Sequence, residues 1–417
     1  MKLGKYSFGI GDRFGRQSKA QLQAVMIAKD ELGIDIVPVW NKSYREHLLI
    51  GSKPSDVNIH ADEAVAALGY KGQYYVDADH INIATVKEFI PYCNYFTIDV
   101  ADYINTKPHI TELRDFLARN RKYTGELAVH GVSEKLNITN ELLSRIGLTY
   151  LNAINKASEV YRLIKSSREN VVIELSMDEV DKPQSLIELF FVLSMIARYG
   201  IPVQTIAPRF TGGFFKGIDY VGNSDDFARE FEGYLHIIEL AVKEFSLPDN
   251  LKLSIHSGSD KFSIYPVIGK LIKKYNRGVH IKTSGTTWLE EITGLAMSGK
   301  EGLQFATMVY EQGYKERHKY MSPYATVIDI NEDKLPEPHE VNNWTATEFV
   351  ETLRHVQTNI YYNKHFRQLM HISYIVAAQN MSDYNRLLKS NSKLIARQVM
   401  ENIYERHIKR IFCSEDK

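Results

Sequence analysis

Cysteine, excess charge of either sign and long apolar runs are all scarce in this sequence. The chain of 417 residues has two cysteines, Cys93 and Cys413, which are far apart and belong to no CxxC pattern. This argues against a disulfide framework or a zinc finger. Lysine and arginine, 51 in all, are balanced by 51 aspartates and glutamates. With no basic excess to neutralise phosphates, we expect neither a nucleic acid nor a membrane surface as a partner.

No segment has the pattern of a signal peptide or a membrane span. The N-terminal residues MKLGKYSFGIG lack an apolar run, and the most apolar predicted helix, 185–201, carries Glu188 and Arg198. At this length such a helix is too short to cross a bilayer. These features predict a soluble, cytoplasmic protein, for which a homo-oligomer is an open possibility.

Eight short apolar runs, most of them followed by residues with helical spacing, predict β-strands that alternate with helices. The runs are 6–11, 34–40, 74–79, 95–100, 171–176, 203–207, 251–255 and 278–283. This order predicts an α/β fold, a (β/α)8 TIM-type barrel, with an open doubly wound sheet as the alternative. The barrel is favoured because chemically useful side chains recur at the C-terminal ends of the strands, where barrel enzymes keep their active sites.

Two stretches do not follow the strand–helix repeat. Residues 107–170 are mostly helical and predict a helical insertion in a catalytic barrel domain that spans residues 1–320. Residues 321–417 predict a C-terminal helical extension packed on the barrel. Three prolines within 320–343 mark a linker or a lid loop between the two parts.

Ionisable and polar side chains gather at the predicted strand ends, namely Asp79, His80, Glu174, Gln204, His256, His280 and Lys282. Three imidazoles on one barrel rim predict a divalent metal site with an open position. The carboxylates left over could act as acid and base from opposite sides of a substrate. Arg13, in the loop after the first strand, is free to meet an anionic substrate group.

Each of these residues also has a structural interpretation. A histidine near a strand end is often only a hydrogen-bonded structural residue, and Asp77 and Asp99 could simply pair with neighbouring backbone or lysine. Glu174 lies in an apolar run, VVIELS, where a carboxylate is costly unless it is paired or used. Lys282 could form a Schiff base or bind a carboxylate as a cation, and we favour the cation.

Several strings, taken in order, resemble the tagaturonate epimerase family. They are GIGDRF (9–14), DADH (77–80), FTID (96–99), IELSMDE (173–179), RFTGGFFKGIDY (209–220), LSIHSGSDKFSIYP (253–266) and HIKTSGT (280–286). The resemblance implies a metal-dependent enzyme of hexuronate catabolism that interconverts tagaturonate and fructuronate.

The resemblance also implies roles for individual residues. Asp79 and Glu174 match catalytic acids or bases, while His80 and His256 match metal ligands. His280 is added as a ligand from its place on the rim. Lys216 is expected near the metal or the substrate carboxylate. Ser257 and Lys261, in the most distinctive of the strings, are candidates for holding the sugar acid, together with Arg13, Gln204 and Lys282.

The implied reaction constrains the mechanism. The inverted carbon lies one bond beyond the carbon next to the ketone, so proton abstraction beside the carbonyl cannot invert it. A divalent transition metal that polarises the ketone, zinc or a close relative, would allow retro-aldol cleavage and re-addition to the other face. The alternatives are a ketohexose 4-epimerase acting on fructose and tagatose, a metal-dependent aldolase that releases its fragments, and a non-catalytic sugar-acid binding protein.

Overall fold

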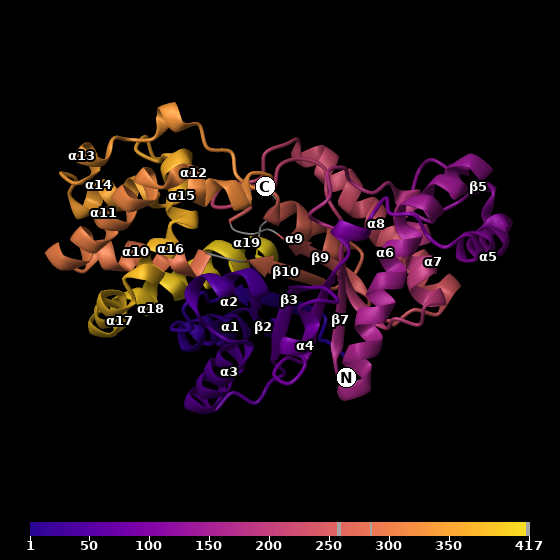
Figure 1. The fold of residues 1–417 in the computed structure, drawn as a ribbon, viewed down its shortest axis with the longest axis horizontal. Helices are drawn as coiled ribbons and strands as arrows, with labels where there is room; N and C mark the ends of the chain where they lie inside the picture. The colour runs from indigo at the N-terminus through magenta and orange to yellow at the C-terminus, as the bar shows by residue number, and fades with distance from the viewer. Residues whose placement is uncertain (257–259, 284–285, 414–417) are drawn as a thin grey trace.

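A closed barrel of eight parallel strands forms the centre of the molecule (Figure 1). The computed structural model describes residues 1–256, 260–283 and 286–413. Around the barrel the strands follow the order β1 (Tyr6–Gly11), β10 (Val279–Thr283), β9 (Lys252–His256), β8 (Val203–Ala207), β7 (Val172–Ser176), β4 (Tyr95–Asp99), β3 (Tyr75–Ile81) and β2 (Ile36–Ser43). The predicted (β/α)8 TIM-type barrel is confirmed.

The strands separate two apolar cores. A small inner core at the N-terminal end of the barrel contains Leu3, Val37, Val39, Tyr75, Tyr95 and Val172. The large outer core lies between the strands and the surrounding helices. Because side chains alternate between the two faces of a strand, the inward positions above the inner core are free to be polar. Those positions carry the ionisable residues described below.

The helices around the barrel begin and end at residues that suit such positions. They include α1 (Ser18–Leu32), α3 (Pro54–Leu68), α7 (Leu186–Arg198), α8 (Ser224–Phe245) and α9 (Tyr265–Lys274). Ser185 and Glu188 form a capping box at the start of α7, and Gly33 ends α1 with a φ of 67°. Among the described residues, no helix combines the length and apolarity that crossing a membrane would require.

The connection between β4 and β7 carries the extra elements expected for residues 107–170. It contains α5 (Ile110–Asn120), the antiparallel strands β5 (Gly125–Leu127) and β6 (Leu136–Ile138), and α6 (Asn140–Ser167). In Figure 1, α5 and β5 lie at the opposite end of the molecule from the C-terminal helices. Besides its helices, the insertion therefore contains a short antiparallel pair of strands.

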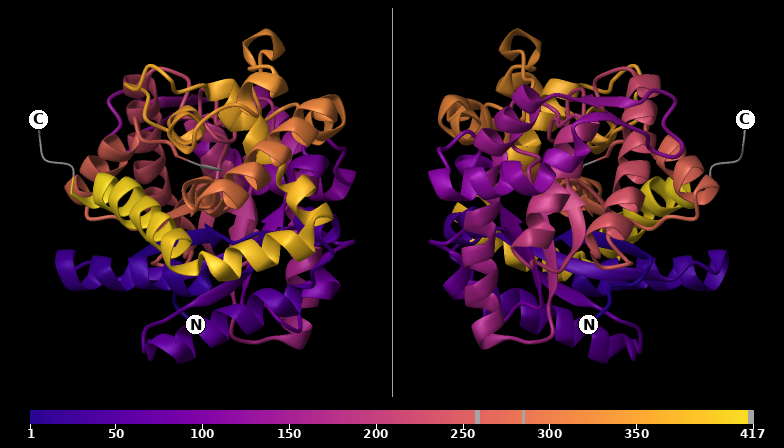
Figure 2. Two further views of the ribbon diagram at one scale, coloured as in Figure 1. Left: turned by 90° about the vertical axis from the view of Figure 1, so that its left-hand side faces the viewer. Right: turned by 90° about the vertical axis from the view of Figure 1, so that its right-hand side faces the viewer.

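The chain described from Thr286 onward is helical. It contains α10 (Thr286–Met297), α11 (Lys300–Lys315), α12 (Arg317–Met321), α13 (Pro338–Val341), α14 (Ala346–Leu353), α15 (Lys364–Ile372), α16 (Tyr374–Gln379), α17 (Met381–Ser390), α18 (Ser392–Glu401), a π-helical turn (Asn402–Ile408) and α19 (Lys409–Phe412). The last helices extend across one side of the barrel, where α18 packs on α1 and α19 on α9 (Figure 2). Since α10 packs on α18 and α11 packs on α15 and α16, helices on both sides of residue 320 are in contact, and the domain division there stays a prediction.

A buried ionic cluster joins this C-terminal part to the chain that follows β9. The Asp260 carboxylate lies 2.8 Å from an Arg367 nitrogen, 3.0 Å from His407 Nε2 and 3.3 Å from His355 Nδ1. Arg367 also donates to the carbonyl of Gly217 at 2.6 Å. Residues from three C-terminal segments therefore meet at one carboxylate beside the barrel mouth.

We expect the Asp260→Asn substitution to lower the free energy of unfolding by about 3–5 kcal/mol, because it leaves the buried Arg367 guanidinium without its anion. Asp249→Asn is the matched control. Its carboxylate pairs with Lys2 at the same 2.8 Å, but the side chain is 78% exposed, so its loss should cost at most about 1 kcal/mol. Denaturant unfolding measures both, and equal effects would contradict the role of the cluster.

Candidate active site

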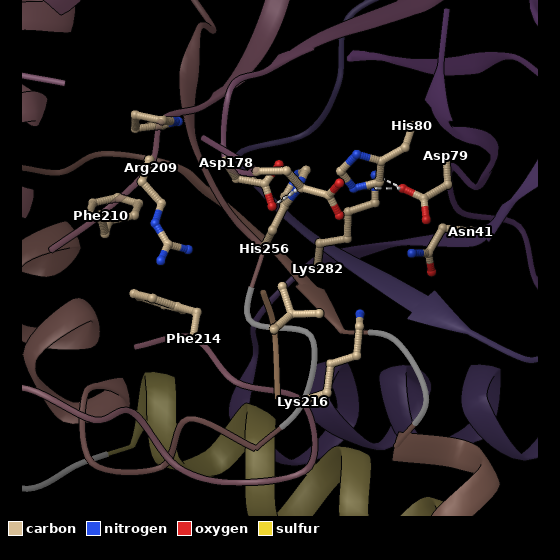
Figure 3. A pocket seen from close by; sticks show the side chains of 13 residues that line it. Asn41, Asp79, His80, Asp178, Arg209, Phe210, Phe214, Lys216, His256 and Lys282 are labelled. Carbon is tan, nitrogen blue, oxygen red and sulfur yellow. Dashed lines mark ion pairs between the residues drawn. The ribbon is translucent and has the colours of Figure 1, made fainter. Parts of the chain in front are cut away.

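A pocket opens at the C-terminal ends of the barrel strands (Figure 3). Strand ends and the loops after them supply its walls. The lining residues are Asn41, Asp79, His80, Asp178, Glu179, Pro208, Arg209, Phe210, Phe214, Lys216, His256, Lys282 and Val327. The sequence-predicted residues Asp79, His80, Lys216, His256 and Lys282 are thus brought together, on the side of the barrel where such enzymes bind substrate.

An irregularity in β3 places two neighbouring residues at this pocket. The register of β3 against β4 shifts between Ala78 and Ile81, and His80 has a φ of 50°. In a regular strand, neighbouring side chains point to opposite faces. The bulge lets both Asp79 and His80 line the pocket, and a positive φ outside glycine is the kind of strain found at functional sites.

His80, His256 and Asp178 form a group suited to hold a metal ion. Each offers one ligand atom, and these atoms all lie within 4.8 Å of one another. Asp178 follows the end of β7 and accepts a hydrogen bond from Ser176. Two imidazoles and one carboxylate with room for a further ligand are a common donor set for a catalytic transition metal.

In each of the two imidazoles, one ring nitrogen is available to a metal and the other lies beside a carboxylate. His80 Nδ1 lies 2.9 Å from Asp99 Oδ2, and His256 Nε2 lies 2.8 Å from Glu174 Oε1. His256 Nδ1 is buried and, although it lies 3.2 Å from Asp178 Oδ2, the two atoms do not have hydrogen-bond geometry. Metal-binding histidines are typically oriented in this way by an outer carboxylate. The residues present therefore fit a divalent metal.

The charge around the two imidazoles also favours a bound cation. Burial alone would lower the pKa of His256, but Asp178 and Glu174 outweigh it and raise the pKa to about 9. The pKa of His80 is likewise raised, against burial, by Asp79 and Asp99. The surrounding carboxylates thus stabilise positive charge at both rings, and a divalent metal would supply it in place of protons.

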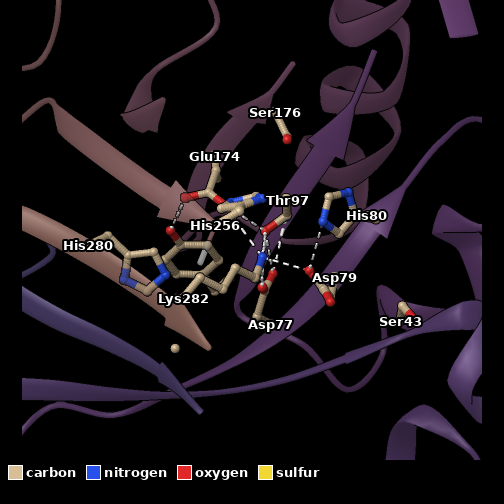
Figure 4. Close-up of polar contacts among 12 residues, drawn as sticks. Ser43, Asp77, Asp79, His80, Thr97, Glu174, Ser176, His256, His280 and Lys282 are labelled. Atoms are coloured by element: carbon tan, nitrogen blue, oxygen red, sulfur yellow. Dashed lines mark hydrogen bonds and ion pairs between the residues drawn. The ribbon is translucent and has the colours of Figure 1, made fainter. Parts of the chain in front are cut away.

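At the edge of the pocket that leads into the barrel, Lys282 lies at the centre of a carboxylate cluster (Figure 4). Its Nζ lies 2.7 Å from Asp77 and from Asp79 and 3.4 Å from Glu174. Burial would lower the pKa of Lys282, but the three carboxylates prevail and raise it. A lysine held protonated is not a nucleophile, so the cluster supports the interpretation of Lys282 as a cation rather than a Schiff-base residue.

Glu174 is placed differently from what an acid or base in contact with substrate requires. Its side chain is fully buried, Oε2 accepts from Tyr95 at 2.8 Å, and Oε1 lies beside His256 and accepts from Thr97 at 3.2 Å. It is not among the residues that line the pocket. The geometry makes it the outer carboxylate of His256.

His280, expected as a third metal ligand, lies deeper in the barrel. Two residues before Lys282 on β10, it is about 7 Å further from the mouth. Its Nδ1 is hydrogen-bonded to Ser7 Oγ at 2.9 Å, and its ring packs against Tyr95. Burial lowers the pKa of His280 to about 3, so the ring is a neutral core residue.

The structure does not bring Gln204 to the pocket. It lies at the start of β8, and a polar residue there faces the N-terminal end of the barrel. Its Oε1 accepts from the backbone of Leu3 at 2.8 Å, and its Nε2 donates to the carbonyl of Met1 at 3.1 Å. Gln204 thus anchors the N-terminus, which corrects its expected place in the substrate site.

Two other residues predicted to contact substrate form hydrogen bonds within the protein. Arg13 donates to the carbonyl of His371 at 2.7 Å and to Glu46 at 3.1 Å, and its guanidinium covers the ring of Tyr374. Lys261 donates to the carbonyls of Phe215 and Ile218 at 2.9 and 2.7 Å. Lys261 therefore supports the backbone around Lys216, while Arg13 lines an adjoining pocket that also contains Asp79, His80 and Lys216. The predicted contact at Ser257 falls outside the described residues.

Sequence reasoning missed Asp178, Arg209 and Asn41. Asp178 lies within the string IELSMDE but two residues beyond the strand, where strand alternation no longer indicates direction. Arg209 follows β8 by two residues in the same way. A rule that searched the first three residues after each strand would have found both of these.

Fold and pocket together define an α/β-barrel enzyme with an acidic, imidazole-containing site at the barrel mouth. The sequence model of one family, tagaturonate epimerase, matches residues 1–412. This chain belongs to that family, and it is an isomerase of the epimerase class.

Individual relatives agree with this assignment. The chain is 27% identical, over an alignment 423 positions long, to the tagaturonate/fructuronate epimerase of Thermotoga maritima, and the alignment covers 96% of this chain and 80% of that one. Crystal structures of the fructuronate-tagaturonate epimerase of Cohnella laeviribosi, native and with one glycerol bound, superpose with TM-scores of 0.80 and 0.81. At 23% identity they cover 99% of this chain and 82% of theirs, and they show the same fold.

The neutral, buried His280 gives a prediction for acid stability. Its pKa is about 3 in the folded chain against 6.5 as the ordinary value. The unfolded state therefore binds the extra proton between these pH values, and stability is lost as pH falls below 6.5. The wild type should lose about 1.4 kcal/mol more per pH unit than His280→Gln between pH 6 and 5. His339→Gln, at an exposed position, should follow the wild type; parallel curves for all three proteins would refute the assignment.

Proposed function

We propose that this enzyme interconverts tagaturonate and fructuronate in a metal-dependent reaction. The observation that carries the proposal is the pairing of two features in one pocket. The His80–Asp178–His256 group forms one part of the wall, and the cations of Arg209 and Lys216 form another. A sugar acid has a chemical group suited to each part of the wall. Its ketone and hydroxyl oxygens suit a metal, and its carboxylate suits the two cations.

His80, Asp178 and His256 would hold the metal, with zinc or a similar transition ion suited to imidazole ligands. A bound divalent metal supplies Lewis acidity, which polarises a ketone oxygen and favours retro-aldol cleavage. Asp99 and Glu174 would orient the two histidines through 2.9 and 2.8 Å contacts. This gives Glu174 a positioning role in place of the expected proton transfer.

Asp79 is the carboxylate suited to move a proton at the substrate. Burial opposes its ionisation, but the Lys282 ammonium and the neighbouring His80 prevail and lower its pKa. Its Oδ1 is paired with Lys282, which leaves Oδ2 to take the proton of the hydroxyl whose carbon is inverted. After the aldehyde fragment has turned and the carbon–carbon bond has re-formed, the new alkoxide on the opposite side takes up a proton from water, and Asp79 releases its own to water, so that no proton is consumed overall.

Arg209 and Lys216 would hold the substrate carboxylate. Both side chains point into the pocket in Figure 3, and neither forms an ion pair with a described residue. Lys216 lies 5.7 Å from the ring of Tyr324. Burial, with the Arg45 charge, lowers the pKa of Lys216, so a bound carboxylate would stabilise its charged form. A neutral ketohexose has no group to satisfy these cations, which favours the sugar acid over fructose or tagatose.

Retention of both fragments separates an epimerase from the aldolase alternative. Phe210, Phe214 and Val327 contribute apolar surface to the same pocket, which would restrict escape of an aldehyde fragment while it turns. Release of three-carbon products during turnover would favour the aldolase.

Removing the metal should abolish turnover of tagaturonate. We expect protein stripped with EDTA to be inactive and Zn²⁺ or a related ion to restore it. Glu174→Gln should bind the metal about 10–100-fold more weakly, because His256 loses its orienting carboxylate. Calorimetric titration measures that affinity. Full activity after chelation would contradict metal dependence, and a Glu174→Gln variant that binds metal normally but stays inactive at saturating metal would return Glu174 to proton transfer.

Replacing Lys216 should separate acidic from neutral substrates. For Lys216→Met we expect kcat/KM for tagaturonate to fall by about 100-fold or more, the equivalent of one lost charged hydrogen bond of about 3 kcal/mol. For tagatose, which has no carboxylate, any measurable kcat/KM should change by less than about threefold. Lys319→Met, at an exposed position, is the control. An equal loss with both sugars would indicate that Lys216 does not contact the carboxylate.

A further inference from the structure

Asn41 on β2 is a buried amide that has no partner. Its side chain is 2% exposed, and neither Oδ1 nor Nδ2 forms a hydrogen bond with any residue in the described ranges. Figure 3 places it beside Asp79 at the edge of the pocket, which it helps to line. Leaving a buried amide unsatisfied costs free energy, and the exceptions in folded proteins call for an explanation.

The neighbours of Asn41 show why no protein group satisfies it. Its register partner on β1 is Gly11, which has no side chain. Its register partner on β3 is Asp77, whose oxygens are taken by Lys282 at 2.7 Å and Thr97 at 3.0 Å. The next residue along β2 towards the N-terminus, Trp40, faces outward and donates to Gln21 of α1 at 3.0 Å. The amide is therefore fixed on the inner face of a strand with no partner on either side.

An amide in this position presents a donor and an acceptor side by side. Nδ2 can donate to a ketone or hydroxyl oxygen, and Oδ1 can accept from a neighbouring hydroxyl. Two adjacent oxygens of a sugar chain offer this pair of groups. A site built to hydrogen-bond a substrate hydroxyl also rejects analogues that lack it, because the polar group is then left unpaired.

We propose that Asn41 is a substrate-binding residue that holds two adjacent oxygens of the sugar chain next to Asp79. The proposal rests on the proposed function, since the ligand is the keto-hexuronate. Asn41 would select sugars that carry an oxygen at both carbons and would keep the reacting hydroxyl within reach of the Asp79 carboxylate.

Asn41→Leu tests this role, because leucine has nearly the same shape but no polar atoms. We expect kcat/KM for tagaturonate to fall by about 10–100-fold, the loss of one or two hydrogen bonds. The thermal midpoint should stay the same or rise, since an unsatisfied amide has been replaced by an apolar group. Asn385→Leu is the matched control. Its Oδ1 is also buried without a hydrogen bond, but it lies on α17 and not in the pocket, so its kinetics should match the wild type.

A substrate analogue lacking one hydroxyl separates binding from a general disturbance of the pocket. The wild type should process the analogue that lacks the hydroxyl held by Asn41 at least tenfold less well than tagaturonate, whereas Asn41→Leu should treat the two sugars nearly alike. Unchanged kcat/KM in Asn41→Leu, or the same penalty in both proteins for every deoxy analogue, would overturn the proposal. A wild type that does not epimerise tagaturonate would instead overturn the proposed function, and the assignment of Asn41 with it.

Discussion

The ammonium group of Lys282, held among three buried carboxylates, is the constraint on which the site depends. Asp77, Asp79 and Glu174 could not share the barrel interior as anions without it, because like charges in a buried space repel and lose hydration. One cation does not balance three anions, however. Burial raises the pKa of Asp77 to about 7, so part of the excess negative charge is relieved by a proton. The rest is available to stabilise positive charge at the pocket above.

The backbone makes room for this arrangement in two places. Gly9 on β1 is the register partner of Lys282 on the neighbouring strand β10, and a Cβ there would lie 2.9 Å from Lys282 Cγ. The glycine therefore leaves the lysine stem its path to the carboxylates. On β3, the bulge at His80 turns a second side chain to the pocket. At both places the strand departs from regular geometry or side-chain content, and the departure positions the side chain of Lys282 or His80.

Strand periodicity allowed much of this to be predicted. Asp79, His80, His256 and Lys282 stand at strand ends, and the barrel brings strand ends together whatever their separation in sequence. The periodicity did not show how far along the barrel axis each side chain lies from the mouth. His280 shares a face with Lys282 but lies one layer lower, where it is hydrogen-bonded to Ser7 and packs against Tyr95.

Two further features could not be predicted from the sequence: the direction of side chains in loops, and the absence of a hydrogen-bond partner for a buried group. Asp178 reaches the site from a loop, whose direction no periodicity encodes. Asn41 lacks a hydrogen-bond partner because of what its strand neighbours are and what they bind. Gly11 has no side chain, and the Asp77 carboxylate is paired with Lys282. Such information is held in three-dimensional contacts and not in residue type.

The C-terminal helices connect fold stability to the proposed choice of substrate. Asp260 and Lys261 are adjacent, and they bind in different directions. Asp260 pairs with Arg367 of α15, while Lys261 donates to the carbonyls that flank Lys216 in the chain. Arg367 adds a bond to the carbonyl of Gly217. The backbone around Lys216 is therefore fixed by side chains from the β9 loop and from the C-terminal part together. A helical extension that only shielded the barrel would not need buried charges at this junction, whereas one that positions Lys216 for its proposed contact with a substrate carboxylate would.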